Sequence, residues 1–397
     1  MRLGAFAIIF PGQFQNANSF LKLFLFYLLL LFQNKQVKKP SPKSALHEKE
    51  GISQPEIISA SVVESIQQFR KVQPSSKELV EGILKGNITA LSRAITLVES
   101  TNNSHLAKAN EVISACLPYA NKSVRIGITG VPGVGKSTFI EAFGKYLTGL
   151  GKKVAVLAVD PSSTISHGSI LGDKTRMEEL VKDENAYIRP SASGETLGGV
   201  ARKTRETITL CEACGFDTII IETVGVGQSE TAVHSMVDFF LLLKISGAGD
   251  ELQGIKRGIM EMADAIVINK ADGDNIKKAK LAKTEFNRAL HLFPAKKSGW
   301  MPTVSTCSAY TKEGIDEVWK TISDYLELTQ NNHYFTEKRS SQNQYWMLET
   351  INEQLKNNFF HHPEIEHLLE ENKKAVQDNE ISPFAAASIL LEHYFKK

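Results

Sequence analysis

The chain has 397 residues, of which 42% are hydrophobic and 23% charged, a composition typical of a globular protein with room for two ordinary domains. Its 46 Lys and Arg residues nearly balance its 44 Asp and Glu residues, so no global basic field indicates a nucleic-acid partner. Four Cys in a chain of this length make no disulfide framework, which favours a reducing compartment.

An apolar run, SFLKLFLFYLLLLF, occupies residues 19–32 and is shorter than the ~20 residues that span a bilayer core. It lacks the small-residue cleavage site of a signal peptide, because QNKQVKKPSPK follows directly. As a signal anchor it would leave the lysines at 35, 38, 39 and 43, and the domain behind them, in the cytoplasm. The alternative, which we favour, is upstream sequence translated from a misassigned start. Only the anchor would give a membrane contact, and the body of the chain is cytoplasmic in both cases.

Residues 1–75 therefore combine this apolar segment with a polar lead-in that we expect to be disordered. Residues 76–122 show three apolar stripes at helical spacing, and Gly86 ends the first of them. The stripes are Leu79, Val80, Ile83 and Leu84; Leu91, Ile95 and Val98; and Leu106, Ala109, Ile113 and Leu117. They predict a small helical extension ahead of the main domain.

Between residues 123 and 330, short apolar runs alternate with helical stretches. The runs are hydrophobic throughout, as strands buried on both faces of a sheet should be, and their alternation with helices predicts an α/β fold with a parallel sheet. The predicted strands are 124–129, 154–159, 217–222, 238–244, 265–270 and 302–307.

Residues 331–397 turn helical and polar. Leu348, Ile351, Leu355 and Phe359 form one apolar stripe. Pro363 can open the next helix, and the pair Ser382–Pro383 is an N-cap and first residue for the last one. This tail has too little apolar surface for a core of its own, so we expect it to pack on the sheet domain or on a second copy of itself.

The segment from Gly130 to Ser137 matches the P-loop pattern G-x-x-x-x-G-K-[ST] and lies between a predicted strand and a predicted helix. Glycines let the backbone turn its N–H groups towards phosphates, the lysine reaches the β and γ phosphates, and the serine hydroxyl ligates Mg²⁺. The predicted phosphate-binding residues are Gly130, Gly133, Val134, Gly135, Lys136, Ser137 and Thr138.

A guanine-reading motif, Asn269-Lys270-Ala271-Asp272, ends a later buried strand. An aspartate there accepts both N–H donors on the edge of guanine, and adenine cannot supply that pair. After the last strand, a backbone N–H of Ser308 or Ala309 is placed to meet the guanine oxygen. The sequence therefore predicts GTP and GDP as the nucleotides.

Magnesium requires oxygen ligands, and carboxylates at the carboxyl ends of parallel strands point towards bound phosphates. The predicted ligands are Ser137, Asp160, Asp173 and Glu222. Each carboxylate can instead cap a following helix, an alternative that stays open for Asp160 in particular because Pro161 follows it.

Hydrolysis is predicted from Lys136, Arg176 and Glu222. Many small GTPases carry a water-orienting Gln directly after the glycine of this segment, whereas Val226 follows Gly225 here. We therefore predict slow intrinsic turnover that a partner raises.

Taken together, the motifs DPSS, GSILGDKTRM, ETVGVGQSE, GAGDELQGIKRGIMEMAD and NKAD resemble those of the methylmalonyl-CoA mutase-associated GTPases, the MeaB/ArgK/MMAA group of the SIMIBI class. The resemblance covers about residues 76–397. It implies a P-loop GTPase domain at 123–330, N-terminal helices at 76–122 and a C-terminal helical dimerisation arm at 331–397.

Members of that family are homodimeric GTP-dependent chaperones that gate adenosylcobalamin loading and protect methylmalonyl-CoA mutase or a related acyl-CoA mutase. By this resemblance Asp160, Asp173 and Glu222 match the magnesium and switch carboxylates, and Asp250 and Lys256 are relay residues to the partner. His167 stands where the family commonly has Gly, which affects the flexibility of the first switch.

Two other functions stay open from the residues alone. A nickel-insertion GTPase usually shows a His-rich N-terminus or a Cys/His metal site, and this chain has 10 His. A transport-associated ATPase or kinase would conflict with the NKAD motif.

The pair Cys211 and Cys214 has metal-ligand spacing, but it ends a predicted helix with no second pair nearby, so we interpret both as apolar packing residues.

Overall fold

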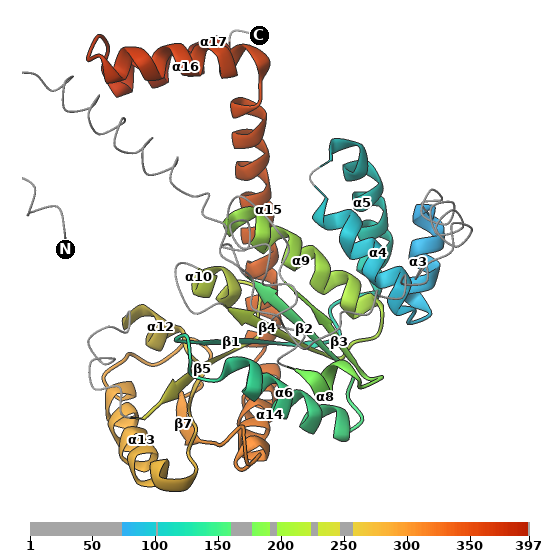
Figure 1. Ribbon diagram of the computed structural model, residues 1–397, viewed down its shortest axis with the longest axis vertical. Helices are drawn as coiled ribbons and strands as arrows, with labels where there is room; N and C mark the ends of the chain where they lie inside the picture. The colour runs from blue at the N-terminus through green and yellow to red at the C-terminus, as the bar shows by residue number, and fades with distance from the viewer. Residues whose placement is uncertain are drawn as a thin grey trace, which may run out of the picture. The chain divides into compact units, whose positions relative to one another are not determined.

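The structure is a computed structural model that describes residues 74–100, 102–159, 177–190, 197–223, 229–246 and 257–395. These residues form a seven-stranded sheet with the strand order β3-β2-β4-β1-β5-β6-β7, in which every pair of neighbours is parallel (Figure 1). The predicted α/β fold is confirmed. The strands are β1 Val124–Gly130, β2 Val154–Val159, β3 Ala186–Arg189, β4 Thr218–Thr223, β5 Phe239–Ile245, β6 Ala265–Asn269 and β7 Thr303–Thr306.

The sequence analysis missed β3, the strand at one edge of the sheet. It has four residues, AYIR, of which only the central two are buried, so it lacks the long apolar run that identified the other strands. Its neighbour β2 pairs with it over four residues, and a hydrogen bond of 3.2 Å between the hydroxyls of Tyr187 and Ser92 ties it to the N-terminal helices.

Helices cover both faces of the sheet (Figure 1). One apolar cluster joins the sheet to α6 and α14, and a second joins it to α9, α10 and the N-terminal helices α3 to α5. A third, smaller cluster packs α12 and α13 against β6. The helices are α3 Ser76–Leu84, α4 Ile88–Glu99, α5 Asn103–Cys116, α6 Lys136–Gly149, α8 Glu178–Val181, α9 Leu197–Ala213, α10 Ser229–His234, α12 Arg257–Met262, α13 Ile276–Leu290, α14 Ile315–Asn331, α15 Tyr334–Phe360, α16 Pro363–Gln377 and α17 Pro383–Phe395, with short 3₁₀ turns at Leu117–Tyr119 and Gly273–Asn275.

Helix boundaries follow local chemistry. Ser75 and Glu78 form a reciprocal capping box at the start of α3. Pro363 is the first residue of α16, as predicted. Pro383 is the first residue of α17, and the hydroxyl of the preceding Ser382 accepts a hydrogen bond of 3.1 Å from Ala385 N, as predicted. Within the described residues, no helix is both long and apolar enough to cross a membrane.

The first half of α15 contacts the central strands through several side chains, of which Arg339 makes four hydrogen bonds. Arg339 donates to both carboxylate oxygens of Asp238, at 2.8 and 2.7 Å, and to the backbone oxygens of Asn121 and Ser123, at 2.9 and 2.6 Å. Burial alone would raise the pKa of Asp238, but the hydrogen bonds and charge of Arg339 outweigh it and hold that pKa below its usual range. Because Ser123 precedes β1 and Asp238 precedes β5, this contact joins α15 to the amino ends of the two central strands.

We expect Arg339→Ala to lower the free energy of unfolding by about 3–5 kcal/mol, because it leaves the Asp238 carboxylate buried without its partner. Urea denaturation followed by circular dichroism measures this. The matched control, Arg288→Ala on the exposed side of α13, should change it by less than about 0.5 kcal/mol. Equal effects from the two variants would contradict the role of Arg339.

Candidate functional site

The P-loop lies at the carboxyl end of β1, near the middle of the sheet, and leads into α6 at Lys136. Gly135 has φ +90°, a left-handed conformation that L-residues with side chains rarely adopt. A Cβ added at Gly135 would also lie 2.9 Å from the amide nitrogen of Asn269. The glycine is therefore needed both for the turn and for the close approach of the base-reading strand.

Lys136 is only 8% exposed, and its ammonium donates hydrogen bonds to the backbone oxygens of Gly130, at 2.8 Å, and Val131, at 3.4 Å. Burial lowers the pKa of Lys136, and the negative charges of Glu222 and Glu230 oppose that shift. The first turn of α6, β4 and α10 thus each supply one buried charged side chain, and the two carboxylates favour the charged form of the lysine.

Asn269, the last residue of β6, connects the P-loop to the loop after β7. Its Nδ2 donates to Val134 O at 2.9 Å, and its Oδ1 accepts from Ala309 N at 3.2 Å and from the Cys307 thiol at 3.5 Å. Lys270 follows in a left-handed conformation with φ +58° and donates to Gly133 O at 2.9 Å. The structure therefore brings the predicted phosphate-binding and base-reading residues together.

Asp272 is oriented by Ser308, whose hydroxyl donates to Asp272 Oδ2 and itself accepts from Thr311 N at 3.1 Å. The backbone N–H of Ser308 donates to Glu313 O at 3.0 Å, and that of Ala309 donates to Asn269. Both N–H groups that were assigned to the guanine oxygen thus have partners within the protein, and their role towards guanine stays a prediction.

Glu222 lies on β4, level with Ile128 of β1 and Ala158 of β2, and is 8% exposed. The next residue, Thr223, donates to the hydroxyl of Thr129 at 2.8 Å, which fixes the ends of β4 and β1 to each other. A serine hydroxyl in the first turn of α6 and a carboxylate at the end of β4 are all-oxygen donors, which is the ligand chemistry that Mg²⁺ prefers.

Several predicted residues lie outside the described parts of the chain: Asp160, His167, Asp173, Arg176, Gly225, Val226, Asp250 and Lys256. Their roles stay predictions. Where the structure describes the chain, no three His, Cys, Asp or Glu side chains are grouped to hold a metal ion.

The cysteine pair behaves as packing residues. Cys211 and Cys214 are buried, free thiols in the apolar cluster beneath the N-terminal helices. Burial raises the pKa of Cys214 to about 11, which keeps that thiol protonated at neutral pH and a poor metal ligand.

Ser229 and Glu230, at the start of α10, received no role from the sequence. Ser229 is fully buried and Glu230 is 4% exposed. Polar residues at the start of a helix are ordinarily interpreted as caps, and only the folded chain shows that the charge of Glu230 acts on Lys136.

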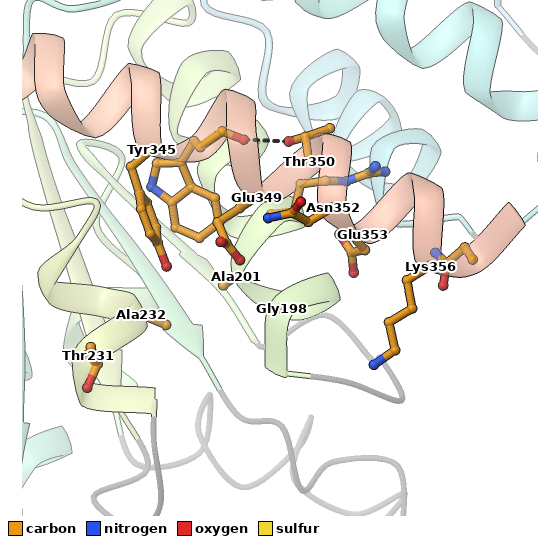
Figure 2. A pocket seen from close by; sticks show the side chains of 13 residues that line it. Gly198, Ala201, Thr231, Ala232, Tyr345, Glu349, Thr350, Asn352, Glu353 and Lys356 are labelled. Atoms are coloured by element: carbon orange, nitrogen blue, oxygen red, sulfur yellow. Dashed lines mark hydrogen bonds between the residues drawn. The ribbon is translucent and has the colours of Figure 1, made fainter. Parts of the chain in front are cut away.

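A cavity of about 700 Å³ opens between α9, α10 and α15 (Figure 2). Tyr345 of α15 lies across from Thr231 and Ala232 of α10, and Trp346 also lines the cavity. The Trp346 indole donates to Ser235 O at 3.2 Å, which fixes the wall to the segment after α10. The remaining lining carries charges of both signs, so the cavity does not select a ligand by charge alone.

Comparison with known proteins extends this picture. The family model described as "Methylmalonyl Co-A mutase-associated GTPase MeaB" matches residues 91–364. GTPase ArgK of Escherichia coli strain K12 is 46% identical over 306 residues, covering 77% of this chain and 92% of that protein. The mouse protein named methylmalonic aciduria type A homolog, mitochondrial, is 46% identical over 334 residues, covering 82% and 80%.

A solved structure named "LAO/AO transport system kinase" superimposes with a TM-score of 0.64 at 39% identity, covering 80% of this chain and 97% of that one. The match of sequence, fold and P-loop geometry gives the coarse activity, that of a P-loop GTPase. The chain belongs to the MeaB family of methylmalonyl-CoA mutase-associated GTPases.

Proposed function

We propose that this protein is a GTP-hydrolysing chaperone that gates adenosylcobalamin loading and protects methylmalonyl-CoA mutase or a related acyl-CoA mutase. The observation that carries the proposal is Asn269, which bonds to the P-loop and to the base-reading loop at once. Through it, the groups that bind phosphate and the groups that read guanine form one unit. The mutase as partner is supported by membership of the mutase-associated family.

In this proposal the phosphates lie on the P-loop, and Lys136 exchanges its backbone partners for phosphate oxygens. Ser137, Asp160, Asp173 and Glu222 hold Mg²⁺, which neutralises charge on the phosphates when bound. Arg176 spreads charge in the transition state. Turnover is intrinsically slow because no Gln follows Gly225 to orient water, and the partner raises the rate.

The homodimer is supported by an apolar stripe on α15. Leu348, Ile351 and Leu355 recur at helical spacing and are 55%, 46% and 58% exposed. We propose that a second copy of the chain covers this stripe, since such a row is too apolar for an isolated surface.

The free, buried cysteines support a reducing compartment, and we propose the cytoplasm.

The alternatives are less well supported. Nickel insertion would require metal ligands near the nucleotide, and the family to which the chain belongs is the mutase-associated one. The transport role for which the related solved structure is named belongs to that protein. In this chain the guanine-reading Asp272 favours a GTPase over an ATPase.

We expect Asp272→Asn to weaken GTP binding by ~100-fold or more, because the variant side chain cannot accept both N–H donors of guanine. It should bind xanthosine triphosphate better than the wild type does, since the amide can donate to the extra oxygen of xanthine. Calorimetric titration with both nucleotides measures this. Asp274→Asn, two residues away and exposed, is the control and should bind GTP normally.

We expect Ile351→Asp combined with Leu355→Asp to convert a dimer to a monomer, because two charges would be buried in the apolar interface. Sedimentation velocity measures the change. Leu281→Asp, at a 62% exposed position on α13, is the matched control and should stay dimeric. A wild-type protein that sediments as a monomer would contradict the homodimer itself.

The partner is tested by co-purification. The immobilised full chain should capture a cobalamin-dependent mutase from an extract of its own cells. The amount captured should differ between GDP and a non-hydrolysable GTP analogue. Lys136→Ala should remove the difference between the nucleotides. Capture of no mutase under either condition would contradict the chaperone proposal.

A further inference from the structure

Helix α10 is positioned by its contact with β1. A Cβ added at Gly127 would lie 3.0 Å from Val233 Cγ1 and 3.1 Å from Val237 Cγ2, so α10 and the segment after it pack directly on that glycine. Because α10 follows β4, it runs antiparallel to β1 in the crossover to β5. Ser229 precedes Val233 by one turn, a rise of ~6 Å.

The same ~6 Å separates Gly127 from Thr129 along the strand. Ser229 is therefore level with the end of β1, where the P-loop begins, and it lies on the face of α10 that Val233 turns towards the sheet. Glu230 is next to it. The helix thus delivers two polar side chains to the carboxyl edge of the sheet beside Lys136, although neither belongs to the P-loop.

Both side chains are buried, and the serine hydroxyl has no hydrogen bond from the described part of the fold. Ser229 is 0% exposed, and its hydroxyl has no partner among the described residues. Glu230 is 4% exposed. Its charge is close enough to Lys136 to favour the charged form of that lysine. Leaving a hydroxyl buried without a partner is costly, so Ser229 indicates that a ligand completes this place beside Glu230.

We propose that Glu230, with Ser229 beside it, orients the water that attacks the γ-phosphate of GTP. The inference rests on the proposed function, since it concerns hydrolysis at that site. Glu222 is committed to Mg²⁺, and Val226 occupies the position of the usual Gln, so Glu230 is the remaining described carboxylate beside Lys136. A carboxylate accepts a hydrogen bond from water and so directs a lone pair of the water oxygen towards phosphorus.

The step balances without another reactant. The water oxygen forms a bond to the γ-phosphorus, and the bond from that phosphorus to the β–γ bridging oxygen breaks. The bridging oxygen and its electron pair leave with GDP, and the proton of the water ends on the released phosphate. Glu230 acts by holding the water, and Lys136 offsets the repulsion between the carboxylate and the phosphates.

The test is single-turnover hydrolysis of GTP by the full chain in excess with Mg²⁺, together with calorimetric binding of a non-hydrolysable GTP analogue. Glu230→Gln, whose side-chain oxygen can still accept a hydrogen bond from water, should keep part of the rate, whereas Glu230→Ala should slow hydrolysis about tenfold or more. The affinity of both variants for the analogue should stay equal or become tighter, because a negative charge beside the phosphates is removed. Glu230→Asp should retain part of the wild-type rate of hydrolysis. The matched control, Glu261→Gln at an exposed position on α12, should leave the rate unchanged.

Ser229→Ala should fold normally, because the lost hydroxyl bonds to no described residue. We expect this variant to lose less of the hydrolysis rate than the Glu230→Ala variant and to bind the analogue with unchanged affinity. An unchanged rate in Glu230→Ala overturns the inference. So does a parallel loss of rate, affinity and melting temperature, which would show a structural role. A wild-type chain that neither binds nor hydrolyses GTP would instead overturn the proposed function.

Discussion

The carboxamide of Asn269 is the interaction on which the site depends. It is 1% exposed, and its two ends bond to Val134 of the P-loop and to Ala309 after β7. Such a side chain has one orientation that satisfies both partners, so it fixes the distance between the loops that bind phosphate and base. The close approach also explains Gly135, where any side chain would meet the amide. The residues predicted to bind phosphate and those predicted to read guanine therefore meet at one junction.

The sheet carries this junction at one end and the C-terminal helices at the other. β1 and β5 run from the Arg339 contact with Ser123 and Asp238 to the P-loop and its neighbours. Between those ends, α10 packs on β1 at Gly127. The charge of its Glu230 acts on Lys136, and its Thr231 lines the cavity beside α15. The elements that contact nucleotide and the elements proposed to contact a second copy thus share two central strands.

The sequence predicted six of the strands to within a residue or two, because a strand buried on both faces must be apolar throughout. The same reasoning could not find β3, an edge strand of four residues. Motif spacing predicted that the P-loop and Asn269 to Asp272 act together, and the structure brings Asn269 and Lys270 onto the P-loop, while their role towards nucleotide stays a prediction. It could not find Glu230 or Arg339. Each looks like a surface charge on a polar helix, and its partners come from distant segments that only the folded chain brings near.

Competition at the nucleotide site tests the central claim, that one junction joins phosphate binding to guanine recognition. A fluorescent GDP bound to the full chain with Mg²⁺ is titrated with GTP and, separately, with ATP. The account predicts displacement by GTP at stoichiometric concentrations and none by ATP at ~1000-fold excess, because adenine leaves the Asp272 carboxylate unpaired. Displacement by both nucleotides over the same concentration range would contradict it.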